Sequence, residues 1–108
     1  MTSDLVTNLR KQIGGPRDGA LLRFSLGNAM LAGGDPAAAV IELRAALVFD
    51  PNYSAAWKLL GRALVDGGDA DAGRVAYTRG IEVASARGDE QAAKEMRVFL
   101  RRLERTAT

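Results

Sequence analysis

The side chains best placed to recognise a ligand in this 108-residue chain are two cations, Lys58 and Arg62. They stand four residues apart, so a helix over about 53–66 would carry both on one face. A guanidinium pairs with a carboxylate through two parallel hydrogen bonds, and an ammonium adds a compact positive charge. The chemistry that this spacing offers is therefore recognition of an acidic group.

Catalytic chemistry has few candidate groups in this sequence. The chain contains no cysteine and no histidine, which excludes disulfides, thiolate nucleophiles, imidazole bases and ordinary zinc sites. The remaining carboxylates, lysines and hydroxyls show no pairing of a nucleophile with a base. We therefore predict that the protein is not an enzyme and that it uses no cofactor and no metal.

Basic and acidic residues are mixed along the chain. There are 15 Lys and Arg against 13 Asp and Glu, a net charge of +2, whereas a nucleic-acid binder concentrates its positive charge. No apolar run approaches the roughly 20 residues that cross a bilayer, and the N-terminal sequence lacks the layout of a signal peptide. We expect a cytoplasmic protein that binds neither nucleic acid nor membrane. The excess of arginine over lysine, with abundant alanine and glycine, suggests a bacterial source.

One sequence pattern occurs twice, 34 residues apart. Residues 26–38 and 60–72 are identical at seven of thirteen positions. The identical pairs are apolar, small or turn-forming residues: Leu26 and Leu60, Gly27 and Gly61, Ala29 and Ala63, Gly33 and Gly67, Gly34 and Gly68, Asp35 and Asp69, and Ala38 and Ala72. A repeat of this length holds two helices, so the chain is predicted to contain two copies of a helical hairpin.

Signals that end one helix and begin the next lie inside each copy. A Gly-Gly-Asp sequence occurs at 33–35 and again at 67–69. The two glycines supply backbone angles that turn the chain, and the aspartate is suited to cap the following helix. The Asp50-Pro51 pair stops the second helix of the first copy. With one flanking helix on each side, the first capped by Ser3, we predict helices at about 3–13, 19–33, 36–49, 53–66, 70–86 and 90–105.

Over about residues 20–87 the chain resembles the tetratricopeptide repeat family, whose period is 34 residues. The first copy carries signature residues at the family spacing as Leu26, Gly27, Ala39, Leu43, Ala46 and Pro51, and the second as Trp57, Leu60, Gly61 and Tyr77. The sequence departs from the family pattern at Arg23, where the family has tryptophan, and at Ser85, where it has proline.

The resemblance implies an all-α fold, an α-α superhelix of stacked antiparallel helical hairpins with about six helices. Residues 1–108 would form a single domain of this kind. Its parts would be an N-terminal packing helix at 3–13, repeat 1 at 20–53, repeat 2 at 54–87 and a C-terminal capping helix at 89–105.

The resemblance also implies a binding role, because such proteins hold a peptide or partner helix in a groove lined by the first helix of each repeat. The groove positions lie about a quarter-turn from the packing face of that helix. In this chain they are Phe24, Asn28, Leu31, Lys58, Arg62 and Val65. This set suits an acidic, partly apolar peptide or a free carboxylate. The clamp that some co-chaperones use for chaperone C-termini is not present, because Phe24 and Leu59 stand where it needs lysine and asparagine.

Two questions stay open at the level of sequence. The module could serve as an adaptor, scaffold or co-chaperone-like protein, or its first or last helix could pack on another copy to form a homo-oligomer. The last predicted helix carries a basic stripe opposite its apolar stripe of Met96, Phe99, Leu100 and Leu103. The basic residues are Lys94, Arg97, Arg101 and Arg105. They fit a solvated face, a nucleic-acid or anionic-lipid contact, or a protein contact.

Overall fold

The computed structural model describes residues 2–106, with side chains from residue 4 onward, and this part of the chain is all-α. Its helices are α1 (Thr2–Arg10), α2 (Ala20–Ala32), α3 (Pro36–Phe49), α4 (Ser54–Asp66), α5 (Ala70–Arg87) and α6 (Glu90–Thr106). The predicted fold class, an all-α stack of about six helices, is confirmed. Within residues 2–106 no helix is both long enough and apolar enough to cross a membrane.

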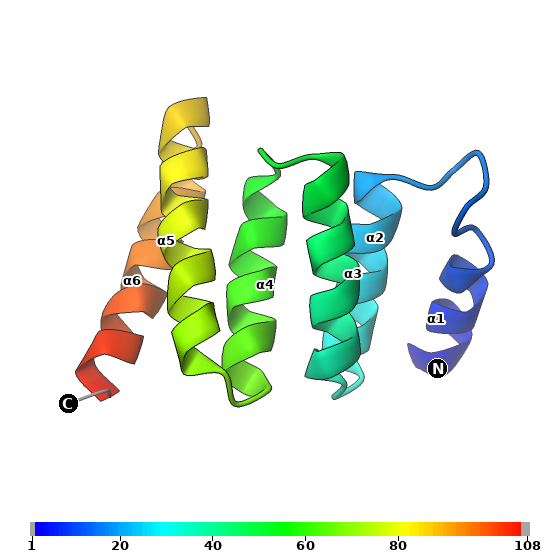
Figure 1. Ribbon diagram of the computed structural model, residues 1–108, viewed down its shortest axis with the longest axis horizontal. Coiled ribbons are helices and arrows are strands. Elements are labelled where there is room, and N and C mark those ends of the chain that lie inside the picture. The colour runs from blue at the N-terminus through cyan, green and yellow to red at the C-terminus, as the bar shows by residue number, and fades with distance from the viewer. Residues whose placement is uncertain (1, 107–108) are drawn as a thin grey trace.

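The helices lie side by side in the order of the chain, with α1 at one end and α6 at the other (Figure 1). Each helix packs against its neighbours in sequence, and α4 also contacts α2 and α6. The first helices of the hairpins, α2 and α4, therefore lie next to each other, with α6 beyond α4. This arrangement forms the face on which the groove residues were predicted.

The turns inside the two hairpins use the predicted residues. Gly34 and Gly68 adopt left-handed backbone angles, with φ of +84° and +91°, whereas the glycine before each has a negative φ. Asp35 and Asp69 then cap α3 and α5, because each side chain accepts a hydrogen bond at 3.1 Å from the backbone N–H three residues later. The local signals thus place both hairpin turns at the same point of each repeat.

The first helix is shorter than predicted. We expected it to span 3–13, but α1 ends at Arg10 and the chain continues in turns. The backbone N–H groups of Gln12 and Ile13 each donate to the carbonyl three residues earlier, and Gly14 has a φ of +81°. These tight turns are incompatible with a continuing α-helix. The predicted cap Ser3 lies outside the described side chains.

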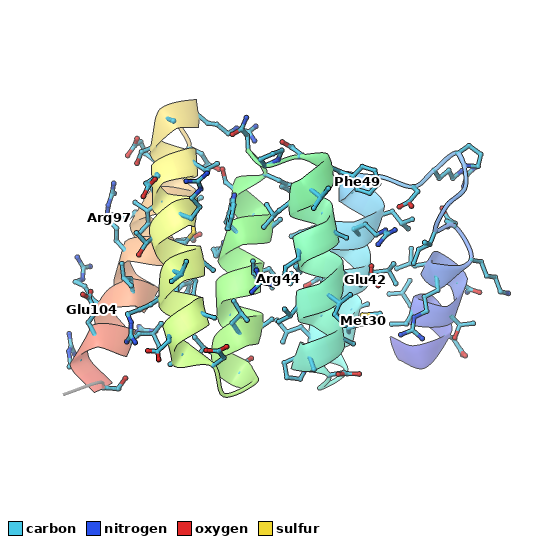
Figure 2. The ribbon with its side chains drawn as sticks, viewed as in Figure 1. Met30, Glu42, Arg44, Phe49, Arg97 and Glu104 are labelled. Atoms are coloured by element: carbon cyan, nitrogen blue, oxygen red, sulfur yellow. The ribbon has the colours of Figure 1, made fainter. Side chains whose placement is uncertain are left out.

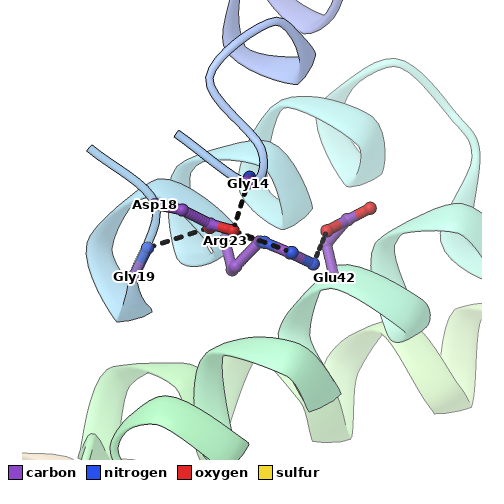
Figure 3. A network of polar contacts seen from close by, with 5 residues as sticks. All are labelled: Gly14, Asp18, Gly19, Arg23 and Glu42. Atoms are coloured by element: carbon purple, nitrogen blue, oxygen red, sulfur yellow. Dashed lines mark hydrogen bonds and ion pairs between the residues drawn. The ribbon is translucent and has the colours of Figure 1, made fainter. Parts of the chain in front are cut away.

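Arg23 stands at the tryptophan position of the first repeat. From α2, its side chain forms polar contacts with the preceding loop and with α3 (Figure 3). Its guanidinium binds Asp18 through two hydrogen bonds of 2.9 and 3.1 Å and reaches Glu42 of α3 at 3.1 Å. Asp18 also accepts hydrogen bonds from the backbone N–H groups of Gly14 and Gly19. The loop before α2 is therefore fastened to the first hairpin by polar contacts.

This network predicts a loss of stability in acid. The Arg23 hydrogen bonds, together with those from the backbone, lower the pKa of Asp18 from 3.8 to about 2. A lowered pKa in the folded state stabilises the protein above about pH 4, and that contribution is lost as the pH falls through about 2. In urea unfolding, Asp18→Asn should have a lower free energy of unfolding than the wild type above about pH 4, and this difference should shrink as the pH falls from about 4 to about 2.

The control for this measurement is Glu104→Gln. Glu104 is exposed and points away from the stack on α6 (Figure 2), and among residues 4–106 it forms no ion pair. The free energy of unfolding of Glu104→Gln should depend on pH in the same way as that of the wild type. If Asp18→Asn and the wild type lost stability in parallel, the contribution assigned to Asp18 would be absent.

Among residues 4–106 the apolar interior contains two clusters, and the side chain of Trp57 packs against both. Leu26, Leu43 and Leu60 are at most 1% exposed and belong to the first cluster, formed by α2, α3, α4 and α5. Met96 is fully buried in the second cluster, between α5 and α6. Trp57 packs against both clusters, and its indole N–H donates to the carbonyl of Pro51 at 2.8 Å. The two hairpins and the last helix therefore share a continuous interior.

Candidate functional site

An open cleft of about 290 Å³ lies between α4, α5 and α6. Its lining consists of Arg62, Val65, Asp66, Tyr77, Phe99, Arg102 and Leu103. Pockets that hold whole drug-sized ligands have volumes of about 300–1,000 Å³. The cleft lies at the lower end of this range, and it can take one or two side chains of a larger partner.

The floor of the cleft is made by aromatic and aliphatic groups. Tyr77 of α5 is 4% exposed and lies directly against Gly61 of α4, which has no side chain to keep it away. The ring of Phe99 on α6 lies 5.7 Å from that of Tyr77 in a tilted arrangement. Burial raises the pKa of Tyr77 to about 12, so its hydroxyl is neutral near pH 7. The floor thus offers apolar surface without a charge.

Two guanidiniums stand at the edges of this floor. Arg62 lies 3.7 Å from Asp66, and both side chains are largely exposed, at 68% and 47%. Exposed pairs of this kind contribute about 0–1 kcal/mol, so Arg62 can exchange Asp66 for another carboxylate at little cost. Arg102 lies over the Phe99 ring at 5.9 Å and forms no ion pair within residues 4–106. The cleft lining carries two cations against one anion.

Lys58 occupies the same helix as Arg62 but is engaged within the protein. Its ammonium lies 2.8 Å from Glu95 of α6, and Gln91 donates a second hydrogen bond to that carboxylate. The Lys58 hydrogen bond, supported by Gln91, lowers the pKa of Glu95. Glu95 therefore remains ionised, and the charge of Lys58 is already balanced before any ligand arrives.

Two of the three predicted first-repeat residues line a second depression, next to α1. This depression is lined by Leu5, Leu9, Phe24, Ser25, Asn28, Ala29 and Ala32. Phe24 stacks on Tyr53 with ring centroids 5.0 Å apart, while Asn28 is exposed. Leu31 is half-buried against the interior and lines neither hollow. Four of the six predicted residues thus line the two hollows, Arg62 and Val65 in the cleft and Phe24 and Asn28 in the depression, whereas Leu31 and Lys58 line neither.

Three cleft residues on α6 were not predicted as part of a site. Phe99 and Leu103 were assigned to the packing stripe, and Arg102 fell outside the basic stripe. The sequence offered one signal for them. The last helix occupies the place of the first helix of a further repeat, and Arg102 follows Phe99 by three residues on the same helix face. The four residues of the basic stripe are all exposed, and Arg97 donates a hydrogen bond to the Ser85 hydroxyl.

Comparison with known proteins agrees with this architecture. Residues 20–63 match the family described as Tetratricopeptide repeat. The TPR repeat-containing protein PA0015 of Pseudomonas aeruginosa (strain PAO1) is 44% identical over 104 residues, which cover 96% of this chain and 99% of that protein. Proteins of this kind are generally protein-interaction modules and are typically non-catalytic.

Two solved structures share the fold. The solution structure of protein BPP2914 from Bordetella parapertussis has a TM-score of 0.82 at 44% identity, covering 94% of this chain and 88% of that chain. The crystal structure of MamA has a TM-score of 0.71 at 19% identity, covering 98% of this chain and 70% of that one, and shows likeness of fold alone. The 34-residue period, the stacked hairpins and these relatives together establish that the chain belongs to the tetratricopeptide repeat family.

Proposed function

We propose that this chain is an adaptor or scaffold module that binds an acidic, partly apolar peptide or partner helix on the face formed by α2, α4 and α6. The observation that carries the proposal is the cleft with its apolar floor between Arg62 and Arg102. One apolar side chain of the partner would cover Phe99 and Val65, and a neighbouring carboxylate would bind the guanidiniums. The proposal retains the cytoplasmic location and the absence of catalysis that the sequence predicts.

The expected affinity is modest. Burial of one large apolar side chain contributes about 1.5–3 kcal/mol, and a hydrogen bond to a charged group contributes about 1.5–3 kcal/mol. Ordering the peptide opposes both terms. A dissociation constant on the order of 0.1–1 mM follows for an isolated short peptide, which amide NMR can measure.

The test is an NMR titration of the labelled protein with short acidic peptides that have free C-termini. Arg62→Ala and Arg102→Ala should each weaken binding about tenfold, because each removes a charge-assisted hydrogen bond worth roughly 1.4 kcal/mol or more. Arg101→Ala is the matched control, since Arg101 is exposed on α6 and does not line the cleft. Lys58→Ala should have a smaller effect than Arg62→Ala, because Glu95 already binds Lys58.

Two results would count against the site. Chemical shift changes confined to the basic stripe of α6 (Lys94, Arg97, Arg101 and Arg105), absent from the cleft residues and removed by salt, would indicate non-specific attraction to that stripe. No shift change with any acidic peptide would remove the proposed function.

Self-association is the alternative, and one repeated feature favours it. Ile41 of α3 and Val75 of α5 are equivalent residues of the two repeats, and they are 67% and 70% exposed. Phe49 at the end of α3 is also 53% exposed (Figure 2). A molecular mass that doubles with concentration, and returns to the monomer value in Ile41→Asp, would establish this function instead.

A further inference from the structure

The two hollows on the α2–α4–α6 side differ in charge. The depression between α1 and α2 is lined without a charged residue, whereas the cleft between α4, α5 and α6 contains Arg62, Arg102 and Asp66. The charge of Lys58 does not change this difference between the hollows, because Lys58 forms an ion pair with Glu95. The lining of the depression is therefore neutral, whereas the lining of the cleft carries two guanidiniums against one carboxylate.

Both hollows open on the same side of the stack. Asn28 lines the depression and Arg62 lines the cleft, and the two residues are equivalent positions of the repeat, 34 residues apart. Equivalent positions on neighbouring first helices point in similar directions. Leu31 of α2 and Leu59 of α4 are half-buried and pack against the first core cluster.

The distance between the hollows fits a short segment of chain. Neighbouring packed helices lie about 8–10 Å apart, so two such steps, from α2 past α4 to α6, cover about 20 Å. An extended chain rises about 3.3 Å per residue, and about six residues span this distance. One peptide of about ten residues can therefore reach both hollows at once.

We propose, as a refinement that rests on the proposed function, that the partner segment binds in one orientation. Its apolar, uncharged part fills the depression between α1 and α2, and its acidic part reaches Arg62 and Arg102. The occupant is an extended peptide with apolar residues at one end and carboxylates at the other. The reverse placement would leave carboxylates in a hollow with no cation and would cover two guanidiniums with apolar groups, which costs free energy.

The experiment uses one peptide of about ten residues, with apolar residues in one half and acidic residues in the other. A nitroxide label is attached either to the acidic end or to the apolar end. In the full chain, the acidic-end label should broaden the amide signals around Arg62 and Phe99. The apolar-end label should broaden those around Leu9 and Asn28. Equal broadening of both regions by both labels, or the reversed pattern, would overturn the orientation.

A double variant that exchanges the side chains at positions 28 and 62 tests whether charge sets the orientation of the peptide. Asn28→Arg combined with Arg62→Asn keeps the composition unchanged and moves one guanidinium from the cleft to the depression. Asn28 and Arg62 are both exposed, so the fold should be retained, and the amide spectrum checks this directly. The acidic-end label should then also broaden signals around Leu9. A wild-type pattern in this folded variant would show that charge does not set the orientation.

The proposed function and the proposed orientation of the peptide would be contradicted by different results. If the peptide produced no shift changes at all, the proposed function itself would fail, and the orientation with it. If the peptide bound and shifted signals in both hollows, but the two labels gave the same broadening, only the orientation would be wrong. A peptide of scrambled sequence and equal charge controls for general electrostatic attraction, and it should show no orientation.

Discussion

Truncation of Leu26 or Leu60 to alanine is expected to lower the free energy of unfolding by about 3 kcal/mol each, because a buried Leu→Ala change removes apolar contacts and leaves a cavity. Leu26 is 0% exposed and Leu60 1% exposed, at equivalent positions of the two repeats. A domain of this size has a total stability of about 5–15 kcal/mol. Either truncation would therefore remove a large share of it, as urea unfolding followed by circular dichroism can measure.

Leu21→Ala is the matched control for both truncations. Leu21 lies in α2 with Leu26, but it is 70% exposed. Its truncation should change the free energy of unfolding by no more than about 0.5 kcal/mol. Three equal losses would contradict the burial argument, whereas a loss at Leu26 without one at Leu60 would show that the repeats are not energetically equivalent.

Gly61→Ala is expected to destabilise the protein by about 2 kcal/mol, against the direction of helix propensity. Alanine in place of glycine inside a helix contributes about 0.5–1 kcal/mol of stability. A Cβ atom at position 61, however, would lie 2.6 Å from Cδ1 of Tyr77 and closer still to Cε1. Tyr77 is buried and backed by Phe99, so the ring has little room to move. Overpacking of this kind costs about 1–3 kcal/mol, and here it should exceed the gain.

A double-mutant cycle with Tyr77→Leu identifies the cause of the Gly61→Ala effect. In the Tyr77→Leu background, Gly61→Ala should cost less than about 0.5 kcal/mol, because the ring that it meets is gone. Thermal unfolding of the four proteins gives the coupling free energy between the two positions. An equal cost in both backgrounds would mean that Tyr77 is not the obstacle. Because Tyr77 lines the cleft, Gly61→Ala should also weaken peptide binding in the titration described above.

The hairpins were predictable from sequence because their signals are local. The Gly-Gly-Asp turns at 33–35 and 67–69 contain both the left-handed residue and the helix cap, and the helix boundaries between residues 19 and 106 differ from the prediction by one residue at most. The end of α1 has no comparable signal. It depends on turns whose loop is fastened by Asp18 and Arg23, which meet only after the chain has folded.

The candidate site was only partly predictable, because its membership depends on how α6 packs. Helical spacing predicts Arg62 and Val65 as groove residues of α4, and both line the cleft. The contribution of Phe99 and Arg102 depends on the rotation of α6, and that rotation is set where Met96 packs against the second cluster. The pairing of Lys58 with Glu95 has the same origin. Contacts between helices far apart in sequence cannot be obtained from the period of a single helix.

The position of α6 at one end of the stack has a consequence for the cleft. Among residues 2–106, α6 contacts only α4 and α5, so it can detach without disturbing the first hairpin. In stacked repeats the ends open more readily than the centre. A partner that bridges Arg62 of α4 and Arg102 of α6 binds only while α6 is docked, and its apparent affinity is reduced by the fraction of molecules with α6 detached. Ligand binding and the docking of α6 are thus linked equilibria, and a bound ligand stabilises the docked position of α6.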